Sequence, residues 1–172
     1  MSSVLAFTIL GLPAHPLIVH GAVVGVPLAA FAALWYVLRP AQRDTWWILC
    51  AVTVAVAWVF TFLAGQTGES LEHALHHSAL IRDHAQWADR LGLAMHIFTP
   101  VFLLSVFLDR RQPRGTISGG GNGAGMQRVL RPLSAVGAVA VLVLVMIVGH
   151  LGAKAAWHDS PAASTSMQAA AR

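Results

Sequence analysis

Charge is scarce in this 172-residue chain: only 10% of its residues are charged, against 56% that are hydrophobic. A soluble domain usually carries about 25% charged residues, because its surface must face water. The scarcity of charge therefore argues against an ordinary soluble enzyme. A disordered chain is excluded too, since disorder requires low hydrophobicity. The composition indicates a protein whose surface faces lipid.

Other expected features are also lacking. The single cysteine, Cys50, lies in an apolar run, so no disulfide can form within the chain. The first twelve residues contain no Lys or Arg, so we expect residues 1–16 to form a retained interfacial segment rather than a signal peptide. The chain has no nucleophile elbow, no His-Glu-x-x-His motif and no carboxylate pair at intramembrane depth. Hydrolytic chemistry is thus poorly supported, and whether the protein is an enzyme stays open.

What the chain does contain is four apolar stretches, each close to the ~20 residues that cross a ~30 Å hydrocarbon core. Helices are expected, because lipid offers no partners to free backbone groups. The stretches span residues 17–38, 46–64, 86–108 and 132–151. The sequence therefore predicts an all-α, integral membrane four-helix bundle over residues 17–157. A flexible glycine-rich linker (115–125) and a disordered tail (158–172) complete the expected organisation.

The distribution of charge predicts the orientation. Seven of the 11 basic residues lie in the segments that join spans one to two and three to four, opposed only by Asp44 and Asp109. The other side has four basic and five acidic residues. The positive-inside rule then places both termini and the segment 65–90 outside a bacterial cytoplasmic membrane. The net charge of +4 is therefore a topology signal, and no nucleic acid partner is predicted.

All nine histidines fall on the predicted outer side. They are His15, His20, His73, His76, His77, His84, His96, His150 and His158. His20 and His150 each lie eighteen residues, about 27 Å, from the inner end of their spans, so they are level. His96 is deeper, about 18 Å from the inner end of its span.

Polar side chains inside a membrane are costly and mark functional sites by default. Two neutral imidazoles from different helices can ligate a haem iron from both faces. We therefore expect haem b near the outer face. Its axial ligands would be His20 and His150, with His84 or His96 as substitutes.

The surroundings of this site have two interpretations. His15 would lie near a haem propionate, and Arg82 or Arg90 could pair with one, since guanidinium matches carboxylate geometry. Glycines beside the histidines leave room for a flat macrocycle. However, Gly21-x-x-x-Gly25 is also a common helix-packing motif, and boundary histidines often bond a backbone carbonyl or a headgroup.

A second constellation lies between spans two and three. At helical spacing, Glu69, His73, His76 and His77 share one face of a short amphipathic outer helix. His73 and His77 have the i,i+4 spacing that zinc or copper accepts, so they form a weaker candidate metal site. Alternatively, these side chains are the polar face of a helix that lies on the bilayer.

Several motifs resemble a bacterial family of four-helix membrane proteins that is classed as a domain of unknown function. HPLIVH at 15–20 is similar to its opening signature, His-Pro-x-x-Val-His. QTGESLE at 66–72, His84, and GHLGA at 149–153 also resemble the family. The resemblance covers about residues 11–157. It carries over His15, His20, His84 and His150, whereas His96 and the 73–77 cluster are particular to this chain.

Relatives in that family are sometimes fused to Rieske or cytochrome c domains, so the resemblance implies redox partners. The leading hypothesis is a b-type cytochrome-like electron-transfer subunit that exchanges electrons with quinone or with an iron–sulfur or cytochrome protein. One alternative is a membrane protein that binds copper or zinc on its outer His-rich face. Another is a structural subunit of a larger membrane complex, without a cofactor.

Overall fold

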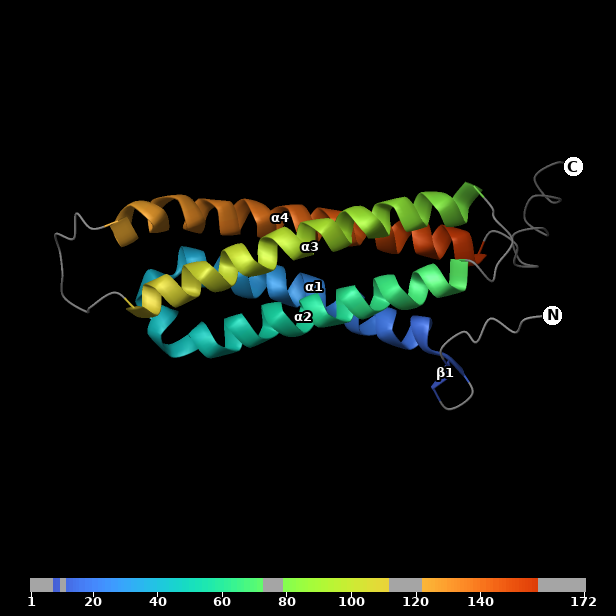
Figure 1. Cartoon of the computed structure of the whole chain (residues 1–172), viewed down its shortest axis with the longest axis horizontal. Coiled ribbons are helices and arrows are strands. Elements are labelled where there is room, and N and C mark those ends of the chain that lie inside the picture. Colours follow the sequence, from blue (N-terminus) through green and yellow to red (C-terminus); the bar gives the residue numbers. More distant parts are fainter. Residues whose placement is uncertain (1–7, 10–11, 73–78, 112–121, 158–172) are drawn as a thin grey trace, which may run out of the picture.

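Four long antiparallel helices form the protein in a computed structural model, which describes residues 8–9, 12–72, 79–111 and 122–157 (Figure 1). The helices are α1 (Ala14–Leu38), α2 (Arg43–Glu72), α3 (Ala79–Arg111) and α4 (Asn122–Trp157), with a 3₁₀ turn η1 (Pro40–Gln42) between the first two. Before α1, strands β1 (Thr8–Ile9) and β2 (Leu12–Pro13) pair antiparallel. All four helices are long and apolar enough to cross a membrane. The prediction of a membrane four-helix bundle is confirmed.

The helices are longer than the predicted spans. α2 continues to Glu72, so Glu69 belongs to α2, and the remainder of the expected short outer helix, residues 73–78, lies outside the described residues. α1 likewise begins inside the expected interfacial segment. Hydropathy detects only the part of a helix that crosses the hydrocarbon, whereas a helix of 36 residues is about 54 Å long and reaches through both headgroup layers.

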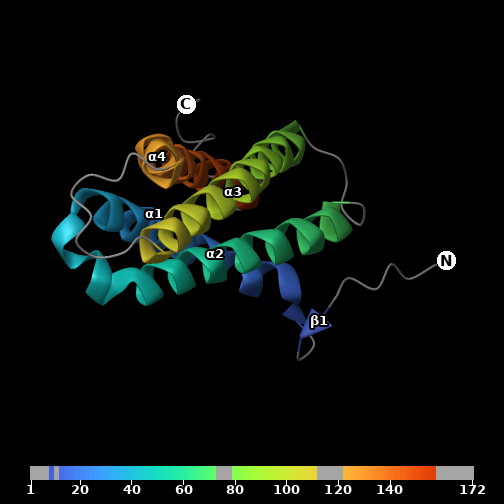
Figure 2. The ribbon, with the colours of Figure 1, turned by 60° about the vertical axis from the view of Figure 1, so that its left-hand side comes forward.

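The helices pack as a closed ring, in the order α1, α2, α3, α4 and back to α1. The pairs α1–α2 and α3–α4 make the most extensive contacts, and α2–α3 is the loosest seam (Figure 2). α1 and α3 therefore lie diagonally across the bundle. Because the helices alternate in direction, the starts of α1 and α3 meet the ends of α2 and α4 at one end. We call this the histidine end, since it carries His15 and His84, and the opposite one the arginine end, since it carries Arg43 and Arg131.

Small residues let α1 and α2 approach closely. A Cβ at Gly21 would collide with the ring of Phe60, and one at Gly25 would lie 3.5 Å from Ala57 Cα. The Gly21-x-x-x-Gly25 spacing thus serves helix contact here, as small-residue motifs do in membranes. Larger side chains fill the middle of the bundle. The fully buried ones include Val26, Val54, Met95, Phe102 and Val141.

One carboxylate ties the four helices together at the arginine end. Asp109 of α3 accepts hydrogen bonds from Tyr36 Oη of α1 at 3.1 Å and from an Arg131 guanidinium nitrogen of α4 at 2.6 Å. Arg43 of α2 approaches the same carboxylate at 3.8 Å and donates to the carbonyl oxygens of Tyr36 and Val37. This network joins all four helices at the arginine end of the bundle.

Candidate functional site

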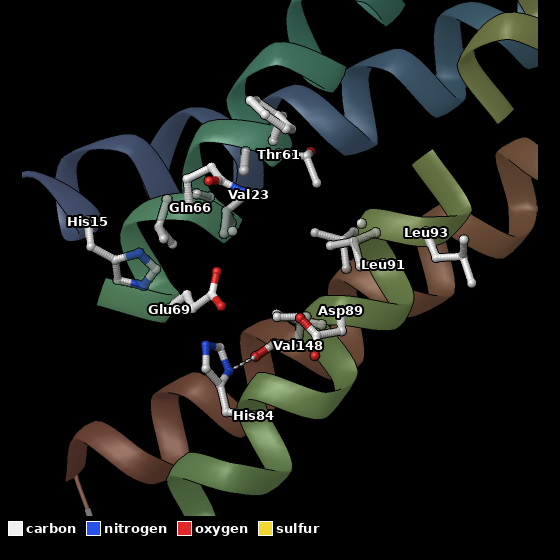
Figure 3. A pocket seen from close by; sticks show the side chains of 18 of the residues that line it. His15, Val23, Thr61, Gln66, Glu69, His84, Asp89, Leu91, Leu93 and Val148 are labelled. Atoms are coloured by element: carbon white, nitrogen blue, oxygen red, sulfur yellow. Dashed lines mark hydrogen bonds between the residues drawn. The ribbon is translucent and has the colours of Figure 1, made fainter. Parts of the chain in front are cut away.

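A cavity of about 670 Å³ opens among the four helices at the histidine end (Figure 3). Its apolar lining comes from all four helices. The polar side chains that line it are His15, Thr61, Gln66, Glu69, His84, Asp89 and His96. Small-molecule and cofactor sites are commonly cavities of about 300–1,000 Å³ with mostly apolar walls and a few convergent polar groups. The cavity has that character.

His15 stands at the start of α1, where its half-buried ring reaches across to α2. Its Nδ1 lies 3.1 Å from Thr67 Oγ1, and that hydroxyl donates its own hydrogen to Leu63 O at 2.8 Å. The tautomer with the proton on Nδ1 satisfies both contacts, because His15 then donates to the hydroxyl oxygen while the hydroxyl donates to Leu63 O. In the neutral ring Nε2 then keeps its lone pair. A Cβ at Gly68 would lie 2.9 Å from Cε1 of the ring, so only glycine leaves room for it.

His84, near the start of α3, has the same arrangement against α4. Its Nδ1 donates to the carbonyl oxygen of Val148 at 3.1 Å, which leaves the lone pair on Nε2. A Cβ at Gly152 would lie 3.0 Å from its Cε1. A ring nitrogen that donates to a carbonyl fixes the tautomer and the orientation of a histidine ligand. Both cavity imidazoles are therefore held as ligating histidines are held.

The two histidines come from diagonal helices, and a carboxylate accompanies them. In Figure 3 the Glu69 side chain projects into the space between the two imidazoles, with Asp89 further along the wall. The polar end of the cavity thus offers two neutral nitrogen lone pairs and acidic oxygens. These groups suit an electrophilic centre such as a metal ion in a cofactor.

His20 and His150 do not share this cavity. Both side chains are exposed and neither lines it, and Nδ1 of His20 bonds the Pro16 carbonyl of its own helix at 2.5 Å. The depth comparison gave their height but not their direction. Five residues separate His15 from His20, which turns a helix by about 140°, so the two cannot face the same space. The structure therefore brings His15 and His84 together at the cavity, rather than the expected axial pair.

His96 lies at the edge of the cavity, on the α2–α3 seam. Its exposed ring meets Trp58 and Phe62 of α2 edge-on, with centroids 5.6 and 6.1 Å away. Its Nδ1 bonds Gly92 O at 2.6 Å. Exposed apolar side chains, including Leu93, line the cavity beside it. The cavity thus reaches the lipid-facing surface at the loosest seam of the bundle.

The other predicted residues lie elsewhere. Arg82 and Arg90 are exposed and do not line the cavity, and Arg90 stacks over the Trp87 ring at 4.3 Å. His73 and His77 lie outside the described residues. Within the described ranges, no group of three or more His, Cys, Asp or Glu side chains is close enough to hold a bare metal ion.

Sequence reasoning missed the residues that support the two imidazoles. Thr67, Gly68 and Gly152 each contact one of these rings, and Asp89 lines the cavity. The available signal was the pair of short motifs QTG and GHLG. Each carries a glycine whose role is clear only once the histidine of a neighbouring helix is placed against it.

A family model described as a predicted membrane protein, DUF2231, matches residues 11–164. No curated protein and no solved structure matches the chain.

Proposed function

The chain belongs to the DUF2231 family of predicted membrane proteins, and from the cavity at its histidine end we propose that it is an electron-transfer subunit that binds haem b. The observation that supports this most is the matched pair His15 and His84. Each imidazole commits Nδ1 to a partner within the protein and leaves Nε2 available in a cavity of cofactor size.

The donor set and the space both fit this cofactor. Two neutral imidazoles from diagonal helices are groups that would hold the iron of a b-type haem, and bundle cores are common sites for such cofactors. The glycines at 68 and 152 leave the rings the room that side chains would take. Haem would supply one-electron transfer there. The protein would position the iron ligands, exclude water with the apolar walls, and place the Glu69 carboxylate nearby.

The electron partner follows from where the cavity opens. Its mouth at the α2–α3 seam is bordered by Phe62, Leu93 and His96, whose side chains face the lipid. This favours a membrane-soluble quinol as the donor over a soluble iron–sulfur or cytochrome protein. Leu93→Trp is expected to narrow the mouth. It should slow reduction of the loaded protein by a short-chain quinol and leave reduction by dithionite unchanged.

The direct test is a titration of the purified, detergent-solubilised protein with haem, together with elemental analysis of the protein as isolated. We expect one haem per chain with a Soret band typical of two imidazole ligands. Stoichiometric copper or zinc without a porphyrin would instead identify a metal-binding protein. If the protein binds neither haem nor a metal, the proposal is refuted and the protein is better explained as a structural subunit.

A further inference from the structure

The arginine end carries more positive charge than its own carboxylates can neutralise. In the part of the chain that the structure describes, six arginines stand there against Asp44 and Asp109. Both aspartates are already paired: Asp44 with Arg110 at 2.5 Å, and Asp109 with Arg131 and Arg43. Three arginines therefore have no carboxylate partner among the described residues. They are Arg39, Arg111 and Arg128, which we call the arginine rim.

The arginine rim lies on the lipid-facing perimeter rather than in the bundle. Arg39 stands over the ring of Trp35 at 5.1 Å, and Arg111 over the ring of Phe107 at 4.1 Å. These rings are 45% and 47% exposed, on the outside of the helices. Arg128 is exposed beside Val129, which is itself 60% exposed. The guanidiniums of Arg39 and Arg111 thus sit where an apolar, exposed surface ends, and the exposed Arg128 lies at the same end of the bundle.

The orientation of these groups suits phosphate. An aromatic ring engages one face of a guanidinium and leaves its edge N–H groups free. Those groups match the oxygens of a phosphodiester and can bind it in a bidentate fashion. At the level of the headgroups, the phosphodiesters of the membrane itself are the nearest such ligands.

From this placement we propose that the arginine rim is a binding surface for anionic phospholipids of the phosphatidylglycerol class. This surface lies at the opposite end of the bundle from the histidine end, and its binding of lipid would not depend on haem. An acidic soluble protein fits less well, because the aromatic and aliphatic neighbours of the rim would stay in contact with lipid chains. The rim would hold the bundle at a fixed depth and select negatively charged lipid around three of its helices.

The test is quenching of tryptophan fluorescence in vesicles that contain brominated phosphatidylglycerol or brominated phosphatidylcholine. Trp35, Trp46 and Trp47 report on this end of the bundle. An arginine near an anionic membrane surface contributes about a fivefold change in affinity. We therefore expect the wild type to prefer phosphatidylglycerol by at least about fivefold at low ionic strength, and less in high salt.

Two matched triple variants remove three positive charges each. Arg39→Gln/Arg111→Gln/Arg128→Gln should bring the preference close to one, whereas Arg82→Gln/Arg90→Gln/Lys154→Gln, at the histidine end, should retain it. Each sample is normalised to its own unbrominated control. Arg128→Gln alone, which disturbs no ring contact, should lower the preference even if the triple variant folds poorly.

Three results would overturn the proposal. The wild type could be quenched equally by both lipids, or the histidine-end variant could lose the preference as fully as the rim variant. Binding of soluble polyglutamate to the rim without any lipid preference would assign this surface to an acidic protein instead.

Discussion

Polar side chains are arranged differently at the two ends of the bundle. At the arginine end, Asp109 receives hydrogen bonds from Tyr36 and Arg131, and Arg43 lies close by. At the histidine end, His15 and His84 each use one ring nitrogen within the protein and keep the other at a cavity. In the first arrangement the charged groups around Asp109 pair with one another and stabilise the bundle, although Nε of Arg131 is buried without a hydrogen-bond partner. The second leaves ligating groups available, as a binding site requires.

The largest effect is expected from a substitution that breaks the Asp109 network at the arginine end. Asp109→Ala removes a carboxylate that is shared by side chains of the three other helices and leaves Arg43 and Arg131, which are 14% and 37% exposed, without a carboxylate partner. The free energy of unfolding should fall by about 3 kcal/mol, which thermal or detergent unfolding would measure. Asp44→Ala is the control, because that carboxylate is 63% exposed and should contribute less than about 1 kcal/mol. Equal losses in the two variants would contradict the assignment of a buried hub.

The next largest effect is expected from Gly68→Ala and Gly152→Ala, at the histidine end. Their new methyl groups would meet the rings of His15 and His84 at 2.9 and 3.0 Å, so the rings must shift. We expect haem binding to be lost or strongly weakened, with a cost to stability of about 1–3 kcal/mol. At Gly125 and Gly149, which do not line the cavity, an added methyl group would have nothing within 4 Å, so Gly125→Ala and Gly149→Ala should bind haem as the wild type does. A haem titration of the four variants measures their affinities. Equal affinity in all four would show that the positions of the two imidazole rings do not matter for haem binding.

A smaller effect is expected from Thr67→Val, which removes the hydrogen-bond partner of His15 Nδ1 while it keeps the shape of the side chain. Loss of such a supporting bond typically weakens a metal ligand by about tenfold or more. Thr53→Val is the control, since that hydroxyl bonds only Leu49 O of its own helix. Dissociation constants measured by haem transfer to an acceptor protein would compare them. Identical constants would show that Thr67 does not orient His15.

The smallest effect concerns the charge at the cavity. Glu69→Gln removes a negative charge beside the imidazoles, which should disfavour the oxidised, more positive form of a bound haem. The midpoint potential should rise, by a shift on the order of a few tens of millivolts. A redox titration followed by visible absorbance measures it. An unchanged potential would place the carboxylate away from the iron, and a fall would contradict the electrostatic argument.

The fold was largely predictable, because the constraint that lipid imposes on apolar runs is strong. Helix ends were less so: α2 continues to Glu72 and α3 begins at Ala79, beyond the apolar limits of their spans. Polar residues in a helix at headgroup depth leave no hydropathy signal. The arginine-end hub was missed for a similar reason. Asp109 and Arg43 were counted as loop charges, and only packing shows that they meet.

The histidines at one end of the bundle could be recognised from the sequence, but the side chains that line the cavity there could not. The sequence placed the histidines at one end, and the structure gathers His15 and His84 there around one cavity. It did not reveal which imidazoles face inward, because depth along a helix says nothing of direction around it. The partners of these rings, such as Gly152 against His84, come from other helices. Such contacts depend on how the helices are rotated and packed.

The reduced-minus-oxidised visible spectrum of four single variants, each loaded with haem, tests the central claim most directly. Removal of a cavity imidazole in His15→Ala or His84→Ala should abolish the bis-imidazole spectrum. His20→Ala and His150→Ala, whose side chains are exposed outside the cavity, should keep it. A spectrum that survives in the first pair and disappears in the second would contradict the account.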